Sequence, residues 1–365
     1  MNSPASSGSA RLAYLDWMRG LAAVIMLQGH AFHSFTKPEL RTSGPYVLSQ
    51  FVGGMPPAIF LFLVGVTLAF LMDNRERKGL GPMARWTASL RRAGYLFALA
   101  FLFRLQLWLF AWPNSPWTDL LKVDILNAMG LAVAVLSPLA LLTTAERARL
   151  GAAVGLLISC ASPLVSQLDW SGVPPIVRAY LAPDYYYFAF FPWASFVAFG
   201  LSAGSILKLV RPEQVERLMQ WTAVLGFALI LGGQYLANVP FSIYPRSEFW
   251  LDSPLLILIK LGVMLVILAF AWLWMTSVVK QRFSVVRQFG LTSLLVYWVH
   301  IELMYGRWFW SWKENLTIGQ TVVAAFGFTI AMLALSIVRT QWKNWRMLGA
   351  WLSWRAMAPR RAFGD

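Results

Sequence analysis

The stretch YLDWMRGLAAVIMLQGHAFHSF, residues 14–35, carries the main evidence for the fold class. It is long and apolar enough to cross a membrane as one helix, since about 20 apolar residues suffice. It nevertheless holds Asp16, Arg19, His30 and His33. Ionisable side chains inside a membrane are costly, so their presence here indicates a function.

The composition of the whole chain agrees with a membrane protein. Of the 365 residues, 58% are hydrophobic and 13% are charged, whereas a soluble domain has about 25% charged residues. The net charge of +15 comes from loop arginines, which is typical of cytoplasmic loops, and we do not expect binding to nucleic acid. The single cysteine, Cys160, excludes an internal disulfide.

Apolar runs predict an all-α, polytopic helical bundle of about ten transmembrane helices. The segments lie near 14–34, 53–72, 92–112, 123–143, 150–166, 188–207, 220–237, 254–276, 290–310 and 319–338. We see no internal repeat and no long linker. We therefore predict a short disordered tail at 1–13, one transmembrane domain at 14–338, and a basic, Trp-rich amphipathic tail at 339–365.

The loop charges predict the orientation of the chain. Alternate connections and the two ends carry 21 Lys and Arg residues, against six in the remaining connections. Because positive loops stay on the cytoplasmic side, both termini should face the cytoplasm. The other loops are rich in Trp, Tyr, Pro and Asp, as in "WPNSPWTD". Their aromatic residues fit either the interfacial belt of a membrane protein or stacking on sugar rings.

The polar residues of the opening stretch share one helix face. At 100° per residue, Arg19 and His30 lie about 20° apart, with His33 and Asp16 about 40° and 60° from Arg19. Arg19 and His30 are about 16 Å apart along the axis. Since lipid cannot solvate this face, it should point into the bundle or a wet cavity.

Further polar residues fall in other predicted spans. The third histidine, His300, lies with Glu302 in "LLVYWVHIELMYG", while Asp124 and Asn127 begin another segment. A buried histidine is often only a hydrogen-bonded structural residue. Three histidines, all in spanning segments, favour instead a general base or a proton relay.

Several chemistries find little support. His30 and His33 are spaced to ligate one ion, but no cysteine or suitable carboxylate joins them, so we expect no metal. We find no G-x-S-x-G nucleophile motif and no Walker or G-x-G-x-x-G loop. Ser-based catalysis and ATP or NAD chemistry are therefore disfavoured.

The first helix resembles that of the transmembrane acyltransferase superfamily, which includes the acyltransferase-3 family. The acyltransferase-3 pattern is Asp-x-x-Arg-Gly with a histidine eleven residues after the Arg. It is matched here by Asp16, Arg19, Gly20 and His30. Four further stretches resemble the heparan-α-glucosaminide N-acetyltransferase-like branch: "PPAIFLFLVGVTLAF", "VDILNAMGLA", "FPWASFVAFGLSAGSIL" and "FGLTSLLVYWVHIELMYG". The lysosomal relatives have a functional histidine after helix 1, and residues 36–52 here have none.

The resemblance implies transfer of an acyl group, most simply acetyl, from cytoplasmic acyl-CoA to a carbohydrate or glycolipid acceptor at or across the membrane. His30 would be the general base and Arg19 would act with it, oriented by Asp16. His300 would join the catalytic group or a second proton path. The remaining candidates are His33, Glu302, Asp124, Asn127 and Trp193 for the substrate, and Arg75, Arg91 and Arg92 for the CoA phosphates. These arginines also fit plain topology charges.

Two other classes of protein remain open. A proton-coupled transporter of a small polar solute would also use buried His, Arg and Asp, but transporters usually carry internal repeats. A structural membrane subunit would not need the cost of the polar face on the first helix. We expect an integral protein of a bacterial cytoplasmic membrane, and the sequence leaves a homodimer open.

Overall fold

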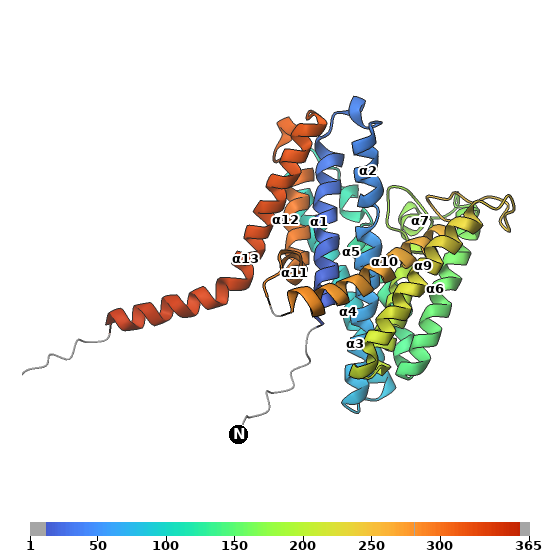
Figure 1. Cartoon of the computed structure of the whole chain (residues 1–365). Helices are drawn as coiled ribbons and strands as arrows, with labels where there is room; N and C mark the ends of the chain where they lie inside the picture. Colours follow the sequence, from blue (N-terminus) through green and yellow to red (C-terminus); the bar gives the residue numbers. More distant parts are fainter. Residues whose placement is uncertain (1–11, 281, 358–365) are drawn as a thin grey trace, which may run out of the picture.

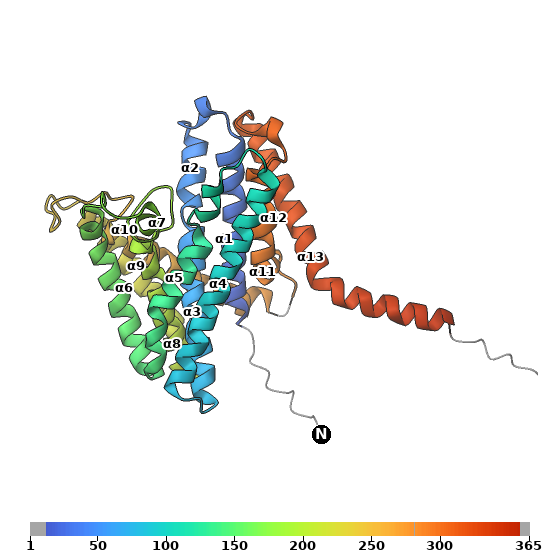
Figure 2. The same cartoon turned by 180° about the vertical axis from the view of Figure 1, so that it is seen from behind.

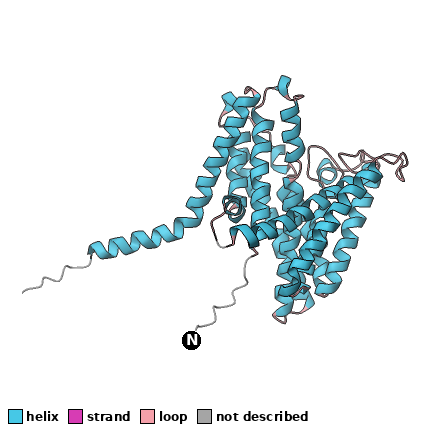
Figure 3. Ribbon diagram, in the orientation of Figure 1, coloured by secondary structure: helices cyan, strands magenta, loops and turns pink. Residues whose placement is uncertain are grey.

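The computed structural model describes residues 12–280 and 282–357, with side chains through residue 342. Its regular structure in this part of the chain is helical, without strands (Figure 3). The α-helices are α1 (Ala13–Phe35), α2 (Gly44–Gly53), α3 (Pro56–Arg77), α4 (Pro82–Ala111), α5 (Ile125–Leu136), α6 (Thr144–Ser166), α7 (Pro175–Leu181), α8 (Phe190–Leu209), α9 (Val215–Ala237), α10 (Pro254–Leu273), α11 (Val285–Leu291), α12 (Ser293–Tyr305) and α13 (Ile318–Met357).

The prediction of a polytopic helical membrane bundle is confirmed. In the described part of the chain, eight helical segments are long and apolar enough to span a membrane, and they match eight of the ten predicted segments. The other two are α1 and the α11–α12 pair. The polar residues of α1 lower its mean hydropathy, and α12 has only 13 residues, about 20 Å of helix against a hydrocarbon core of about 30 Å.

Glycines allow α3 and α8 to pack at very short range. A Cβ on Gly65 would lie 2.0 Å from the Val197 carbonyl oxygen, and one on Gly200 would lie 1.9 Å from that of Phe62. Small residues at a membrane helix interface let the backbones approach, which gains dispersion contacts. The contact belongs to a large apolar core that also includes residues of α5 and α6.

The same device joins α1 to α11. A Cβ on Gly20 would lie 1.7 Å from the Val286 oxygen, and one on Gly290 would lie 1.7 Å from the Asp16 oxygen. Gly20 is the glycine of the Arg-Gly motif, so its role is to admit the backbone of α11. The contact fixes the end of α1 that carries Asp16 and Arg19.

An inner charge cluster joins α3, α4, α6 and α8 at one end of the bundle. It consists of Asp73, Glu76, Arg77, Arg85, Thr144, Arg147 and Lys208. Glu76 Oε2 lies 2.7 Å from Arg147 Nη2 and 2.8 Å from Arg85 Nη1. Three connections that we predicted to be cytoplasmic therefore meet at the same end, as the loop charges require.

The connections predicted to face outward meet elsewhere. Tyr185 donates a hydrogen bond to Glu248 at 2.8 Å, and Ser166 donates one to Asp252 at 2.5 Å. These bonds tie the 166–189 region to the 238–253 loop. Two sets of loops thus gather separately, which is the arrangement of a chain that crosses a membrane repeatedly.

Figures 1 and 2 show α1 between α2 and α12, while α6 and α9 lie on the other side of the bundle. The helix α10 runs obliquely from α9 to the lower end of α1 in Figure 1, where Phe270 packs against Trp17. The helix α13 runs along α1 and α12, and its second half leaves the bundle at an angle (Figure 1). That this half lies on the membrane surface stays a prediction. Most of the tail predicted at 1–13 lies outside the described residues.

Candidate active site

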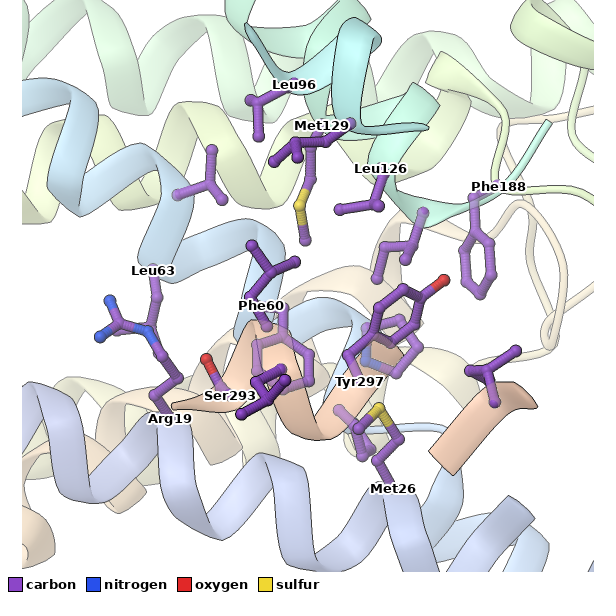
Figure 4. Close-up of a pocket in the computed structure, with 18 of the residues that line it drawn as sticks. Arg19, Met26, Phe60, Leu63, Leu96, Leu126, Met129, Phe188, Ser293 and Tyr297 are labelled. Atoms are coloured by element: carbon purple, nitrogen blue, oxygen red, sulfur yellow. The ribbon is translucent and has the colours of Figure 1, made fainter. Parts of the chain in front are cut away.

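A cavity of about 820 Å³ lies between α1, α3, α4, α5 and α12. Figure 4 shows Arg19 and Met26 rising from α1 on one side, with Leu96, Leu126 and Met129 opposite. Phe188 lies at the end remote from Arg19 in this view. No carboxylate lines the cavity among the described residues. The basic side chains in its wall are Arg19, His30, Arg92 and Arg104.

The polar face of α1 lies where the sequence predicted. Arg19 and His30 both line the cavity, and Met26 lies between them. Asp16 is buried behind this wall, and its Oδ1 accepts a hydrogen bond from Arg19 Nη1 at 3.0 Å. The carboxylate neutralises part of the charge and orients the guanidinium, as its spacing of three residues allows.

His30 and His300 form a direct pair, although they are 270 residues apart in the chain. His30 Nδ1 lies 2.8 Å from His300 Nε2, and the two rings stack with centroids 5.1 Å apart. His300 is fully buried, and its Nδ1 lies 2.7 Å from the carbonyl oxygen of Val296. His30 lines the cavity and His300 stands behind it.

His33 lies one turn beyond His30 on α1, beside Tyr305. Its Nδ1 is 3.1 Å from the Tyr305 hydroxyl, and the Tyr305 ring also packs edge-on against His30 at 5.3 Å. Tyr305 lines the cavity, whereas His33 contacts it only through this tyrosine.

Glu302 on α12 is buried and does not line the cavity. It accepts hydrogen bonds from Gln106 Nε2 at 3.3 Å and from Trp308 Nε1 at 3.1 Å. Trp298 Nε1 in turn donates to Gln106 Oε1. Because neutral donors from α4 and from beyond α12 satisfy this buried carboxylate, its contacts are typical of a structural residue that joins α4 to α12.

Asp124 and Asn127 begin α5 with a capping box. Asp124 Oδ1 accepts from the backbone N–H groups of Leu126 and Asn127, at 3.0 and 3.3 Å. Its Oδ2 pairs with Arg104 Nε at 3.2 Å, and the Arg104 side chain lines the cavity. Asn127 donates to the Tyr180 hydroxyl at 2.9 Å. Thus Asp124 meets the cavity through Arg104, and Asn127 fixes the helix start.

The remaining predicted site residues are spread out. Arg92 lines the cavity and lies over the Tyr95 ring at 5.4 Å, while Arg91 is exposed and Arg75 is half-buried in the last turn of α3. Trp193 packs against Phe188, a cavity residue, and Lys260 Nζ lies 5.3 Å from its ring centre. Arg92 is therefore the one predicted donor-binding arginine that reaches the cavity.

Sequence reasoning missed Tyr297 and Tyr305, which line the cavity on α12. They lie three residues before and five after His300, so the histidine itself was the signal for them. Within residues 12–280 and 282–357, no three His, Cys, Asp or Glu side chains gather to hold a metal ion. The expectation that no metal takes part stays a prediction.

Comparison with known proteins places this geometry in a family. Residues 11–244, more than half of the chain, match the family model described as heparan-α-glucosaminide N-acetyltransferase, catalytic. No curated protein matches the chain. The matched region includes α1 with Arg19 and His30, the α3–α8 core, Arg92 and the start of α5. The chain is an integral membrane protein that belongs to the heparan-α-glucosaminide N-acetyltransferase catalytic-domain family.

Proposed function

We propose that the protein transfers an acyl group, most simply acetyl, from cytoplasmic acyl-CoA to a carbohydrate acceptor at or across the membrane. The observation that carries this proposal is the cavity, which has Arg19 and Arg92 among its wall residues together with His30. Members of the family use acetyl-CoA as donor, and the two arginines suit its phosphates.

The dimensions of the cavity are compatible with a long donor. Arg19 and His30 lie eleven residues apart on one helix, about 16 Å along its axis. Most of the wall between them is apolar, including Met26, Phe60 and Leu63. The pantetheine arm of an extended acyl-CoA would cross this apolar part. The CoA phosphates would then lie near the arginines and the thioester near His30.

In the reaction, the acceptor oxygen or nitrogen attacks the thioester carbonyl carbon while His30 takes its proton. The new C–O or C–N bond forms, and the resulting oxyanion collapses and breaks the C–S bond. The departing CoA sulfur takes the proton from His30, so the enzyme returns to its starting state. The step consumes no metal, nucleotide or redox equivalent.

The test is binding of acetyl-CoA to the purified protein, with ATP as the competing nucleotide. We expect selective binding that weakens about tenfold in Arg92→Gln or Arg19→Gln, since each removes one charge-assisted contact of about 1.4 kcal/mol. Arg149→Gln is the matched control, because Arg149 is an exposed inner arginine of α6 outside the cavity wall. Arg91→Gln and Arg75→Gln test the two other arginines predicted from the sequence.

Failure of a folded sample to bind acetyl-CoA selectively would overturn the proposal. It would favour the alternative of a proton-coupled transporter, which uptake into proteoliposomes with an imposed pH gradient would then examine. The acceptor, the choice between O- and N-acylation, the bacterial cytoplasmic membrane as location and a homodimeric state remain parts of the proposal. A screen of amino sugars, glycans and lipid-linked sugars addresses the acceptor.

A further inference from the structure

We infer that His300 is a positioning residue that fixes the tautomer of His30 and leaves His30 Nε2 as the basic atom. This inference rests on the proposed function for the role of His30, but its geometry is independent of the donor and the acceptor. It assigns different roles to two histidines that the sequence could not distinguish.

The argument starts at the far end of the pair. A carbonyl oxygen can only accept a hydrogen bond, so the 2.7 Å contact between Val296 O and His300 Nδ1 requires a proton on Nδ1. Neutral imidazole carries one N–H, and the other nitrogen keeps its lone pair. His300 Nε2 is therefore an acceptor.

The next contact transmits this choice to His30. His300 Nε2 lies 2.8 Å from His30 Nδ1. Since Nε2 of His300 accepts, Nδ1 of His30 must donate. The lone pair of neutral His30 then resides on Nε2. A chain of two hydrogen bonds, anchored on a helix carbonyl, thus selects one of the two tautomers.

Burial makes the selection strong. His300 has no solvent exposure, and an unpaired nitrogen there would lose a hydrogen bond that water cannot replace. Two adjacent imidazolium cations would repel each other at low dielectric, so the pair carries at most one extra proton. When His30 Nε2 takes a proton, its Nδ1–H bond to neutral His300 becomes charge-assisted and stabilises the imidazolium.

The arrangement resembles in logic the orienting group of a nucleophile–base pair, where a third residue sets the tautomer of the base. Here a neutral imidazole takes the place of a carboxylate. A carboxylate is present nearby in sequence, Glu302, but its oxygens accept from Gln106 and Trp308 instead.

The chain offers a direct test, because it contains only three histidines. Nitrogen-15 NMR of the full protein labelled at histidine, in detergent or nanodiscs, reads which ring nitrogens carry protons. Resonances are assigned with His30→Gln and His33→Gln. We expect Nδ1–H and a bare Nε2 for both His30 and His300 in the wild type. A wild-type spectrum with the proton on His30 Nε2 overturns the inference, whatever the fate of the variants.

Two substitutions separate positioning from packing. His300→Gln keeps an acceptor for His30 Nδ1–H, whereas His300→Leu keeps similar bulk without one. In the Leu variant we expect His30 to lose its single tautomer and turnover to fall at least about 100-fold. In the Gln variant we expect His30 to keep its tautomer and turnover to fall about tenfold. Equal turnover losses with an unchanged His30 tautomer would contradict the inference.

The readouts also separate this inference from the proposed function. Acetyl-CoA affinity should be unchanged in both His300 variants, because His300 does not line the cavity. If the wild type does not bind acetyl-CoA but shows the expected tautomers, the transferase proposal fails and the histidine arrangement stands. If it binds acetyl-CoA but the tautomers differ, the reverse holds.

Discussion

The inner charge cluster and the cavity wall contain similar residue types and use them in opposite ways. In the cluster, Glu76 contacts both Arg85 and Arg147 within 2.8 Å, and the charges compensate one another. Along the cavity, no carboxylate lies among the described wall residues, and Arg19 and Arg104 pair with Asp16 and Asp124 behind the wall. Charges that pair within the cluster hold helices together, whereas positively charged side chains on a cavity wall can also contact a ligand.

The largest expected effect in this comparison is the loss of the cavity histidine. His30→Ala should lower turnover by about 10²–10⁴, the usual contribution of a general base. Acetyl-CoA binding should remain, since Arg19 and Arg92 are untouched, while the lost hydrogen bond to buried His300 should lower the free energy of unfolding by about 1–3 kcal/mol. Steady-state kinetics together with a thermal unfolding curve measures both. Full turnover in the folded variant would remove His30 as the base.

The second largest effect should come from disturbing the close contact between α1 and α11. In Gly290→Ala the new Cβ would lie 1.7 Å from the Asp16 carbonyl oxygen, so α11 must move away from α1. Overpacking of this kind costs about 1–3 kcal/mol. We expect a lower unfolding temperature and weaker acetyl-CoA binding through displaced Arg19. Gly232→Ala is the matched control, because nothing lies within 4 Å of a Cβ there; an equal loss in both would dismiss the close contact as the cause.

Arg147→Met examines the other region. Arg147 is fully buried, and its Nη2 contacts Glu76 at 2.7 Å and Thr144 at 2.6 Å. Removing these bonds should lower the free energy of unfolding by about 1–3 kcal/mol, while turnover per folded molecule stays within about twofold. The control is Arg149→Met, two residues along α6 and exposed. A specific loss of turnover in a stable Arg147 variant would show that the cluster is more than structural.

The smallest effect should come from the outer loops. The hydrogen bond to Glu248 raises the pKa of Tyr185, so this contact is lost only as the pH rises beyond the ordinary range of a tyrosine. Tyr185→Phe should therefore change stability by less than about 0.5 kcal/mol, with no new pH dependence between pH 6 and pH 9. A change of stability within that interval, followed by circular dichroism, would point to a different protonation state.

Much of the fold followed from the sequence because membrane helices are marked by long apolar runs. The loop arginines also gave the grouping of connections that the inner charge cluster displays. The helix face of Arg19 and His30 followed from the geometry of one helix, which needs no tertiary information. The close contact between Gly20 and Gly290 could not be predicted from the sequence, because it depends on how α11 packs against α1.

The histidine pair lay beyond sequence reasoning for the same reason. His30 and His300 are 270 residues apart, and their contact depends on the break between α11 and α12 at Thr292. The apolar pattern runs through this break and predicted one helix at 290–310. Thr292 Oγ1 bonds to Ser336 Oγ of α13 at 2.5 Å, and Gln288 Nε2 donates to the same hydroxyl at 3.0 Å. These contacts with α13 orient α12, and hence His300.

The wall without carboxylates has a consequence for the membrane itself. A protein that brings a donor and an acceptor together inside the bilayer must keep a wide hollow there without collapsing the ion gradients. Fixed positive charge in a pore raises the energy of any cation within it, hydronium included. In the proposed transferase, the charge of Arg92 would therefore raise the energy of a cation in the cavity and attract the anionic donor, while Asp16 and Asp124 offset the charges of Arg19 and Arg104.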